Sequence, residues 1–324
     1  MWAIVCRDWC EPDQLELDDV PVPVLTAGGV RIAVRAAGLN FADSLMIRGE
    51  YQVKPQLPFS PGLEISGDVL DVAPDVSRFQ PGDRVMAVVP YGGFAEEVVA
   101  RATDVFLIPE LLDYVSAAGF PIAYGTSHVG LRDKLKLQAG ETLLVHGAAG
   151  GVGLTAVEIA KKMGATVIAT AGGADKLKIA KSYGADHLID YKTEDIRARV
   201  KMLTAGRGVD AVYDPVGGDV FTASLRATVQ GGRILVVGFA SGTVAPVPAN
   251  LLLVKNLSVI GFYWGAYRTL DPALLADSFE ELLAWYAAGA LKPHISHCFD
   301  LADAAKAMAM LQSRKATGKI VLKV

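Results

Sequence analysis

Glycine and alanine predominate at positions 146–153, which read His-Gly-Ala-Ala-Gly-Gly-Val-Gly. In a G-x-G-x-x-G frame, Ala148 takes the first glycine position, and Gly150 and Gly153 take the other two. Glycines let the backbone approach a pyrophosphate closely, and the N-terminus of a following helix offers unpaired N–H groups to that anion. The pattern therefore predicts a dinucleotide site formed by Ala149, Gly150, Gly151, Val152 and Gly153.

The elements around these glycines decide between a ligand site and a tight turn that only packs a helix on a strand. Residues 142–145 are an apolar run typical of a buried strand, 154–163 have helical spacing, and 165–170 read as a second strand. Strand, glycine turn, helix and strand is the setting in which this motif binds dinucleotides. A turn without a ligand would need only one or two glycines, so we favour the dinucleotide site.

The end of the second strand indicates which dinucleotide binds. An NAD site usually carries Asp or Glu there, bound to the 2′-hydroxyl of the adenosine ribose. Residues 171–173 are Ala-Gly-Gly, and Asp175 comes later, at an expected helix start. Small residues leave room for a 2′-phosphate, and the charge of Lys176 could neutralise it. The sequence therefore predicts NADPH rather than NADH.

The pattern of the chain changes near residue 122 and again near residue 262. Before 122, alternating runs such as 30–35 and 67–72 and frequent Gly and Pro predict a barrel-like β-rich domain. From 123 to 262, apolar strands alternate with helices, which predicts a parallel sheet covered on both faces. Its further strands are expected at 187–190, 209–213, 233–237 and 257–262.

The tail is expected to return to the first domain. It reads as helices at 273–288 and 301–311 and a final strand at 318–324, and chain ends often lie close together. We therefore predict one domain from 1–122 and 263–324, and a dinucleotide-binding domain from 123–262.

The composition excludes several classes of protein. The 324 residues carry a net charge of −4 without a basic patch, which argues against nucleic acid as a partner. Three cysteines do not make a disulfide framework and fit a reducing compartment. Charge interrupts the N-terminus too early for a signal peptide, and no apolar run of about 18 residues predicts a membrane span. We expect a cytoplasmic protein.

These features together resemble the medium-chain dehydrogenase/reductase superfamily, and within it the zinc-free quinone oxidoreductases related to zeta-crystallin. The segments that carry the resemblance are 37–43, 48–51, 57–64, 82–85, 92–96, 145–153, 184–186 and 318–320. They span the whole chain and are more specific for the family than for a substrate. The resemblance implies an α/β fold in which a Rossmann parallel-sheet domain is inserted in a β-rich, GroES-like catalytic domain.

The resemblance also raises the question of zinc, because alcohol dehydrogenases of the superfamily hold a catalytic zinc through a cysteine, a His-Glu pair and a further ligand. Asn40 stands where the cysteine would be and Leu63 where the histidine would be, although Glu64 remains. An amide and an aliphatic group do not hold zinc. Residues 294–298, His-Ile-Ser-His-Cys, look like ligands, but in an extended segment positions three apart point to opposite faces. We expect no metal.

Further site residues follow from family positions. Asn40 is predicted to donate a hydrogen bond near the nicotinamide or to the substrate, and Tyr51 either to do the same or to act as a weak proton donor. Thr126 matches a threonine near the nicotinamide carboxamide. The alternatives are a turn-capping Asn, a packing Tyr and a helix-interior Thr. The predicted cofactor positions outside the glycine turn are Gly172, Lys176 and Tyr191 near the adenosine phosphate, the C-terminal Arg314, and Gly238 and Phe239.

Without a metal, hydride is best delivered to an acceptor that needs no Lewis acid. Quinones and conjugated enones meet this condition, and orientation, desolvation and hydrogen bonds to the developing oxyanion can then supply catalysis. We expect an NADPH-dependent, zinc-independent reductase of quinones or α,β-unsaturated carbonyls. Two alternatives stay open: an enoyl-thioester (acyl-CoA) reductase, for which Arg48, Lys54 and Arg268 are candidate basic residues, and a non-enzymatic NADPH-binding or structural protein on the same fold.

The partner expected besides the small-molecule acceptor is a second copy of the chain. The apolar residues 251–254, followed by 257–264, are predicted to form the last strand of the core sheet. An apolar edge strand favours a partner, and the resemblance implies a homodimer through this edge. The alternative is an edge covered by its own loop or by Trp264.

Overall fold

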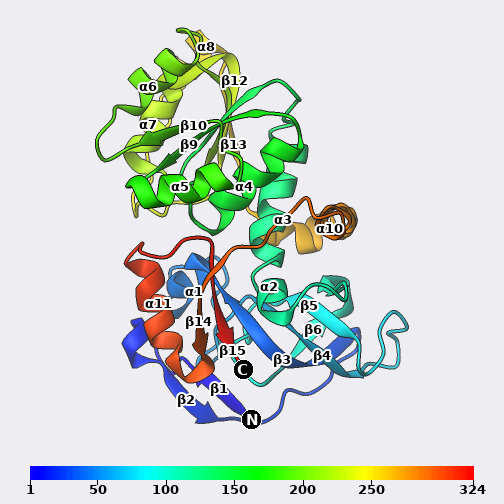
Figure 1. Ribbon diagram of the computed structural model, residues 1–324. Coiled ribbons are helices and arrows are strands. Elements are labelled where there is room, and N and C mark those ends of the chain that lie inside the picture. The colour runs from blue at the N-terminus through cyan, green and yellow to red at the C-terminus, as the bar shows by residue number, and fades with distance from the viewer. The chain divides into compact units, whose positions relative to one another are not determined.

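The structure is a computed structural model that describes all 324 residues. It divides into two compact units, each with its own sheet (Figure 1). Unit 1 contains Met1–Ile122 and Lys292–Val324, and unit 2 contains Ala123–Leu291. No helix in either unit is long and apolar enough to cross a bilayer.

Unit 2 is built on a six-stranded parallel sheet in the order β10-β9-β8-β11-β12-β13. The chain runs outward from β8 to β10, returns to the centre at β11, and runs outward again to β13. The strand order therefore reverses between β8 and β11, and ligands of such sheets bind at the carboxyl ends of the strands at this point. The strands are β8 (Thr142–Val145), β9 (Thr166–Ala171), β10 (His187–Asp190), β11 (Val209–Asp214), β12 (Thr228–Val236) and β13 (Ser258–Gly261).

Helices follow these strands as the alternating pattern predicts. Side chains on consecutive positions of β8, β9 and β11 are buried, as in a sheet covered on both faces. The helices are α3 (Pro121–Val129), α4 (Gly151–Lys162), α5 (Ala174–Ser182), α6 (Ile196–Leu203), α7 (Gly218–Ala227), α8 (Ala249–Lys255), α9 (Tyr267–Leu270) and α10 (Pro272–Ala287), with short helical turns at Gly130–Lys134 and Trp264–Ala266.

Unit 2 ends at Leu291, whereas the sequence pattern placed this boundary at 262. The added segment carries α10, and α10 packs on α3. His128 Nδ1 lies 2.8 Å from Ser278 Oγ, and the rings of His128 and Trp285 meet edge to face. These contacts join positions far apart in the sequence, so the local pattern gave no sign of them.

One element of unit 2 differs from its prediction. Residues 251–254 do not belong to the last strand, because they lie in α8, which begins after Pro248. Asn256 ends this helix in the left-handed conformation, with φ of 49°, and β13 begins only at Ser258. The shorter β13 is nevertheless at the edge of the sheet, as predicted.

Unit 1 is a β-rich domain with a seven-stranded sheet. Six strands follow the order β14-β15-β3-β4-β5-β7, β6 pairs with β3, and β1 and β2 form a separate ribbon. The last strand, β15, pairs antiparallel with β3, and Ile320 lies opposite Leu39. Through this pairing the C-terminal segment returns to the unit that contains the N-terminus.

The sheet of unit 1 encloses an apolar core that includes Ile32, Ile65 and Phe94. Its strands are β1 (Trp2–Val5), β2 (Glu16–Asp19), β3 (Gly29–Leu39), β4 (Glu64–Val72), β5 (Arg84–Val88), β6 (Glu97–Arg101), β7 (Val105–Leu107), β14 (Ile295–Asp300) and β15 (Lys319–Lys323). Its helices are α1 (Phe41–Ile47), α2 (Tyr114–Ala118) and α11 (Ala304–Gln312), with single turns η1 (Pro12–Gln14), η2 (Ala102–Asp104) and η5 (Leu301–Asp303).

Candidate functional site

The glycine segment forms the turn between β8 and α4 at the reversal of the strand order. Gly147 is in the left-handed conformation with φ of 57°, and its carbonyl accepts from Gly150 N at 2.9 Å. A Cβ at Gly153 would collide with the same carbonyl, so only glycine lets the helix begin this close to the turn. The N–H groups of the first turn of α4 have no partners within the helix, and they are the groups that the sequence predicts to bind an anion.

The predicted cofactor residues that follow β9, β10 and β12 all lie at the carboxyl ends of the strands, because all strands of this sheet run in the same direction. A methyl group added to Gly172 would lie 2.7 Å from the Tyr191 hydroxyl oxygen. One added to Gly217, in the loop after β11, would lie 2.9 Å from the Phe239 ring. The structure therefore brings Gly172 and Tyr191 together and places Phe239 beside the β11 loop. Lys176 lies in the first turn of α5.

His146 is fully buried and ties the turn to two neighbouring elements. Its Nδ1 lies 2.9 Å from Thr170 Oγ1 in β9, and its Nε2 lies 2.7 Å from Ser224 Oγ in α7. Ser224 Oγ donates to the carbonyl of Val220, so it accepts from Nε2–H, and Nδ1 accepts from Thr170. Burial lowers the pKa of His146, an effect that the negative charge of Asp214 partly offsets. His146 is therefore held neutral at the start of the glycine turn.

This neutral imidazole predicts a loss of stability in acid. Below the ordinary histidine pKa of about 6.5, the unfolded chain binds a proton that folded His146 resists, so the free energy of unfolding falls as pH decreases. His146→Gln keeps a donor towards Ser224 and does not titrate. We expect the stability difference between the wild type and this variant to shrink from pH 7 to pH 5 in urea unfolding. A difference independent of pH would contradict the assignment.

In unit 1, Asn40 lies at the start of α1 and contacts two buried charged side chains. Its Nδ2 donates to Glu64 Oε1 at 2.9 Å, and its Oδ1 accepts from Lys319 Nζ at 2.8 Å. Lys319 Nζ also donates to Glu64 Oε1 at 2.6 Å and to the Leu39 carbonyl at 2.7 Å. The second Glu64 oxygen accepts from Ile122 N at 2.8 Å. The side chains of Lys319 and Glu64 are 8 % and 0 % exposed.

Asp43 supports this cluster from the first turn of α1. It is fully buried, and its oxygens accept from Asn40 N at 2.7 Å and from Gly62 N at 3.2 Å. Burial raises the pKa of Asp43 to about 7, although the two backbone hydrogen bonds and the charge of Lys319 act in the opposite direction. Through these two hydrogen bonds, Asp43 braces the loop that carries Asn40.

The side chains around Asn40 do not provide a set of ligands for a zinc ion. Asn40 Oδ1 and Glu64 Oε1 already accept from the Lys319 ammonium, and the third position is the aliphatic Leu63. Over the whole chain, no three or more His, Cys, Asp or Glu side chains gather in a way that could hold a metal ion. Residues 295–298 of the suspected cluster lie in the strand β14.

The remaining predicted residues lie in different surroundings. Tyr51 is half-buried and packs against the apolar core of unit 1. Thr126 is buried inside α3 of unit 2, with 6 % of its surface exposed. Arg314 is exposed just after α11 and takes a left-handed conformation with φ of 57°.

The sequence analysis did not identify Lys319 as a site residue. The only signal in the sequence was a lysine directly before the apolar run Ile-Val-Leu, where a charged side chain is unusual.

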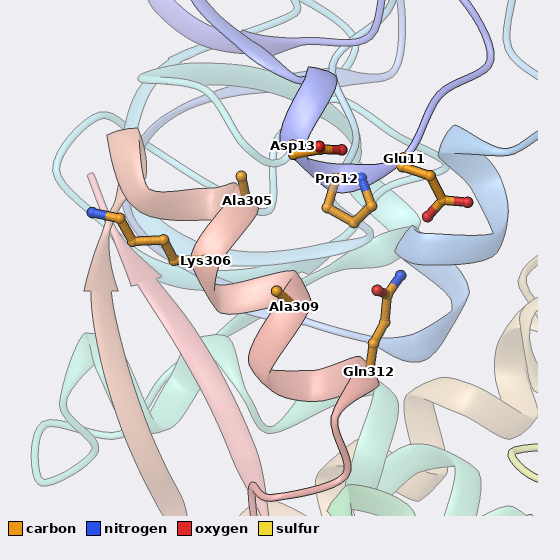
Figure 2. A pocket seen from close by; sticks show the side chains of 7 residues that line it. All are labelled: Glu11, Pro12, Asp13, Ala305, Lys306, Ala309 and Gln312. Atoms are coloured by element: carbon orange, nitrogen blue, oxygen red, sulfur yellow. The ribbon is translucent and has the colours of Figure 1, made fainter.

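A groove on unit 1 is separate from this set of residues. Figure 2 shows it between η1 and α11, and its lining residues are Glu11, Pro12, Asp13, Ala305, Lys306, Ala309 and Gln312. None of the predicted cofactor or substrate residues lines it, so it plays no part in the candidate site.

Comparison with known proteins decides the family. Residues 26–110 match the alcohol dehydrogenase GroES-like domain, and residues 151–287 match a domain described as zinc-binding dehydrogenase. The quinone oxidoreductase-like protein 2 homolog of Nematostella vectensis is 43 % identical over 99 % of this chain and 88 % of its own length. The chain belongs to the quinone oxidoreductase family of the medium-chain dehydrogenases and reductases. The quinone oxidoreductase-like protein 2 of Bos taurus is 40 % identical over 99 % of this chain and 91 % of its own length.

Solved structures of this quinone oxidoreductase family confirm the predicted fold. The crystal structure of Escherichia coli quinone oxidoreductase complexed with NADPH matches with a TM-score of 0.95 and 30 % identity, covering 100 % of both chains. A Rossmann sheet inserted in a GroES-like domain is therefore shown. The match to the zinc-binding dehydrogenase domain covers residues 151–287 and does not include Asn40, Leu63 or Glu64.

Proposed function

We propose that this protein is an NADPH-dependent, zinc-independent oxidoreductase that transfers hydride to quinones or α,β-unsaturated carbonyls. The observation that carries the proposal is the glycine turn at the reversal of the strand order, where the closeness of Gly153 to Gly147 leaves the N–H groups of α4 open to a pyrophosphate. The proposal also draws on the E. coli family member, whose structure is complexed with NADPH.

The residues of unit 2 would bind and orient the cofactor, which supplies the hydride when bound. The N–H groups of Gly151, Val152 and Gly153 would hold the pyrophosphate. Lys176 and Tyr191, beside Gly172, would receive the 2′-phosphate, because no acidic side chain occupies residues 171–173. Gly238, Phe239, Thr126 and Arg314 are proposed to complete the cofactor contacts.

The residues of unit 1 would act on the acceptor. Asn40 is half-buried, and one hydrogen of its amide is bound to Glu64, while the other has only a long contact of 3.4 Å with the Gly38 carbonyl. This second N–H is proposed to donate to the oxygen on which negative charge develops during hydride transfer. Tyr51 is proposed to orient the acceptor or to supply a proton. Neither role needs a metal.

A panel of acceptors tests the proposed function. The purified protein is mixed with NADPH and 1,2-naphthoquinone, an alkenal or crotonyl-CoA, and the loss of NADPH absorbance is followed. We expect turnover of the quinone or the alkenal. Turnover of crotonyl-CoA alone would instead indicate a thioester reductase. Tight NADPH binding without turnover of any acceptor would indicate a non-enzymatic role.

Replacement of Lys176 tests the choice of cofactor. Loss of a charge-assisted contact to the 2′-phosphate is worth about 1.5–3 kcal/mol, or roughly tenfold to a hundredfold in affinity. We therefore expect Lys176→Ala to weaken NADPH binding by at least about tenfold and to leave NADH binding nearly unchanged, as measured by fluorescence titration. Lys178→Ala, at an exposed lysine of the same helix, should change neither. Equal losses for both cofactors would refute the assignment.

We also propose a homodimer formed through the edge of the unit 2 sheet. β13 is the edge strand, and the preceding α8 exposes 78 % of Leu253 and 71 % of Val254. We expect light scattering at micromolar concentration to give twice the 34.2 kDa chain mass and Leu253→Lys to give monomers. Leu111→Lys, at an equally exposed leucine of unit 1, should leave the dimer intact. A wild-type monomer would end this proposal.

A further inference from the structure

Lys319 Nζ is surrounded by three acceptors that satisfy all of its hydrogens. They are the carbonyl oxygen of Leu39, Asn40 Oδ1 and Glu64 Oε1, at 2.7, 2.8 and 2.6 Å. An ammonium group only donates hydrogen bonds, and an ionised carboxylate only accepts them. A lysine this deeply buried is rare unless it is paired, and Lys319 has Glu64 as its ion-pair partner.

The two charged groups leave the Asn40 amide only one favourable orientation. Its oxygen must face the Lys319 ammonium and its nitrogen must face Glu64 Oε1. In the flipped orientation, two donors would meet at Lys319 and two acceptors would meet at Glu64. An amide between apolar neighbours has no such constraint, because its oxygen and nitrogen are nearly equal in size and either orientation packs equally well.

We infer that Lys319 is a positioning residue for the reaction, which fixes the Asn40 amide so that its second N–H is presented to the acceptor oxygen. This inference rests on the proposed function, since it assumes that Asn40 donates to the acceptor. Lys319 itself has no hydrogen left for a ligand and acts through Asn40. The C-terminal strand β15 thereby supplies Lys319 to a site whose other residues, Asn40 and Glu64, lie at the starts of α1 and β4. Glu64 precedes Lys319 by 255 residues in the chain.

The double variant Lys319→Met/Glu64→Gln separates positioning from charge. It leaves no unpaired buried ion, so the unit is expected to fold. The carbonyl oxygen of the new side chain at position 64 stays with Ile122 N, which needs an acceptor, so the new NH2 group faces Asn40. We expect the Asn40 amide then to turn its oxygen towards this NH2 group and away from its capping contact with the Asp43 backbone N–H, so that its second N–H no longer points as it does in the wild type.

Asparagine-selective 15N labelling reports the amide orientation directly, because the chain has only three asparagines. In the wild type, the side-chain amide signals of Asn40, assigned by their absence in Asn40→Ala, should be well separated and should exchange slowly with solvent. In the double variant, we expect these signals to shift and to exchange faster. Lys323→Met, at an exposed lysine of the same strand, should leave them unchanged.

Kinetics then tests whether the orientation matters for the reaction. Loss of one donor to a developing oxyanion lowers kcat by roughly a hundredfold or more. We expect kcat to fall by the same factor in Asn40→Ala and in the double variant. The triple variant, which combines Asn40→Ala with Lys319→Met/Glu64→Gln, should lose no more than either. The dissociation constant of NADPH should stay within about twofold of the wild-type value in all three.

The outcomes distinguish the inference from the proposed function. Asn40 amide signals that are unchanged in the double variant would overturn the positioning role of Lys319. A triple variant that loses far more kcat than Asn40→Ala would overturn it as well, because Lys319 would then act independently of Asn40. If the signals move but Asn40→Ala retains full kcat, positioning stands and the proposed donor role of Asn40 fails.

Discussion

Gly153→Ala is expected to abolish measurable NADPH binding at micromolar concentration and to destabilise unit 2. The added Cβ would collide with the Gly147 carbonyl and lie 3.0 Å from Ala148 Cα. These neighbours are backbone atoms that cannot rotate away, so α4 must move from the turn. Overpacking of this kind costs about 1–3 kcal/mol, and the displaced N–H groups of α4 would no longer lie where the pyrophosphate is proposed to bind. Fluorescence titration with NADPH and urea unfolding measure the two effects.

Two other glycines provide matched controls. Gly150 has an ordinary extended backbone, with φ of −83° and ψ of 177°, and a Cβ there would meet only the Gly147 carbonyl, at 3.3 Å. Gly150→Ala should therefore keep the stability within about 0.5 kcal/mol but weaken NADPH binding, because the second glycine of the motif lets the backbone approach the pyrophosphate. Gly261→Ala, with no atom of its own chain within 4 Å, should leave NADPH binding unchanged. Normal NADPH affinity in Gly153→Ala would contradict the proposed cofactor site.

The parts of the fold that the sequence predicted correctly depend on local signals. Residues 142–145 and 187–190 form β8 and β10 with the predicted bounds, because each is a short run with β-branched or leucine side chains that follows a glycine turn, at Gly140 and Gly184. The glycine motif located the turn for the same reason, since the motif, the strand before it and the helix after it are contiguous. The shared direction of the parallel strands then places the predicted cofactor residues that follow β8, β9, β10 and β12 at the carboxyl ends of the strands.

The features that the sequence did not predict depend on contacts between distant residues. Residues 251–254 are apolar and suit a strand or a helix equally, and the left-handed Asn256 that ends α8 gives no local signal strong enough to decide. The boundary at 262 failed to include α10, which belongs to unit 2 through Ser278. Lys319 meets Glu64 only because β15 pairs with β3 next to β4, and no local pattern reveals that pairing.

The buried pair of Lys319 and Glu64 predicts a large and strongly non-additive effect on stability. Lys319→Met leaves the Glu64 carboxylate buried without its cation, and Glu64→Gln leaves the ammonium without its anion. Breaking a buried ion pair from one side costs about 3–5 kcal/mol, whereas replacing both partners by neutral residues of similar volume is often neutral. We expect each single variant to lose about 3–5 kcal/mol and the double variant to lie within about 1–2 kcal/mol of the wild type.

Hydrogen exchange of the backbone amides in β3 and β15 measures this cycle within unit 1, because exchange reports the stability of the segment that opens. Lys323→Met removes a lysine of the same strand at an exposed position and should cost no more than about 0.5 kcal/mol. Losses that simply add in the double variant would mean that the two charges do not depend on each other. The Asn40 amide would then lie between two charges that do not stabilise each other, and the 2.6 Å contact between Lys319 and Glu64 would not contribute to the stability of unit 1. A double variant close to the wild type shows instead that each charge is tolerated in the core only because the other is present.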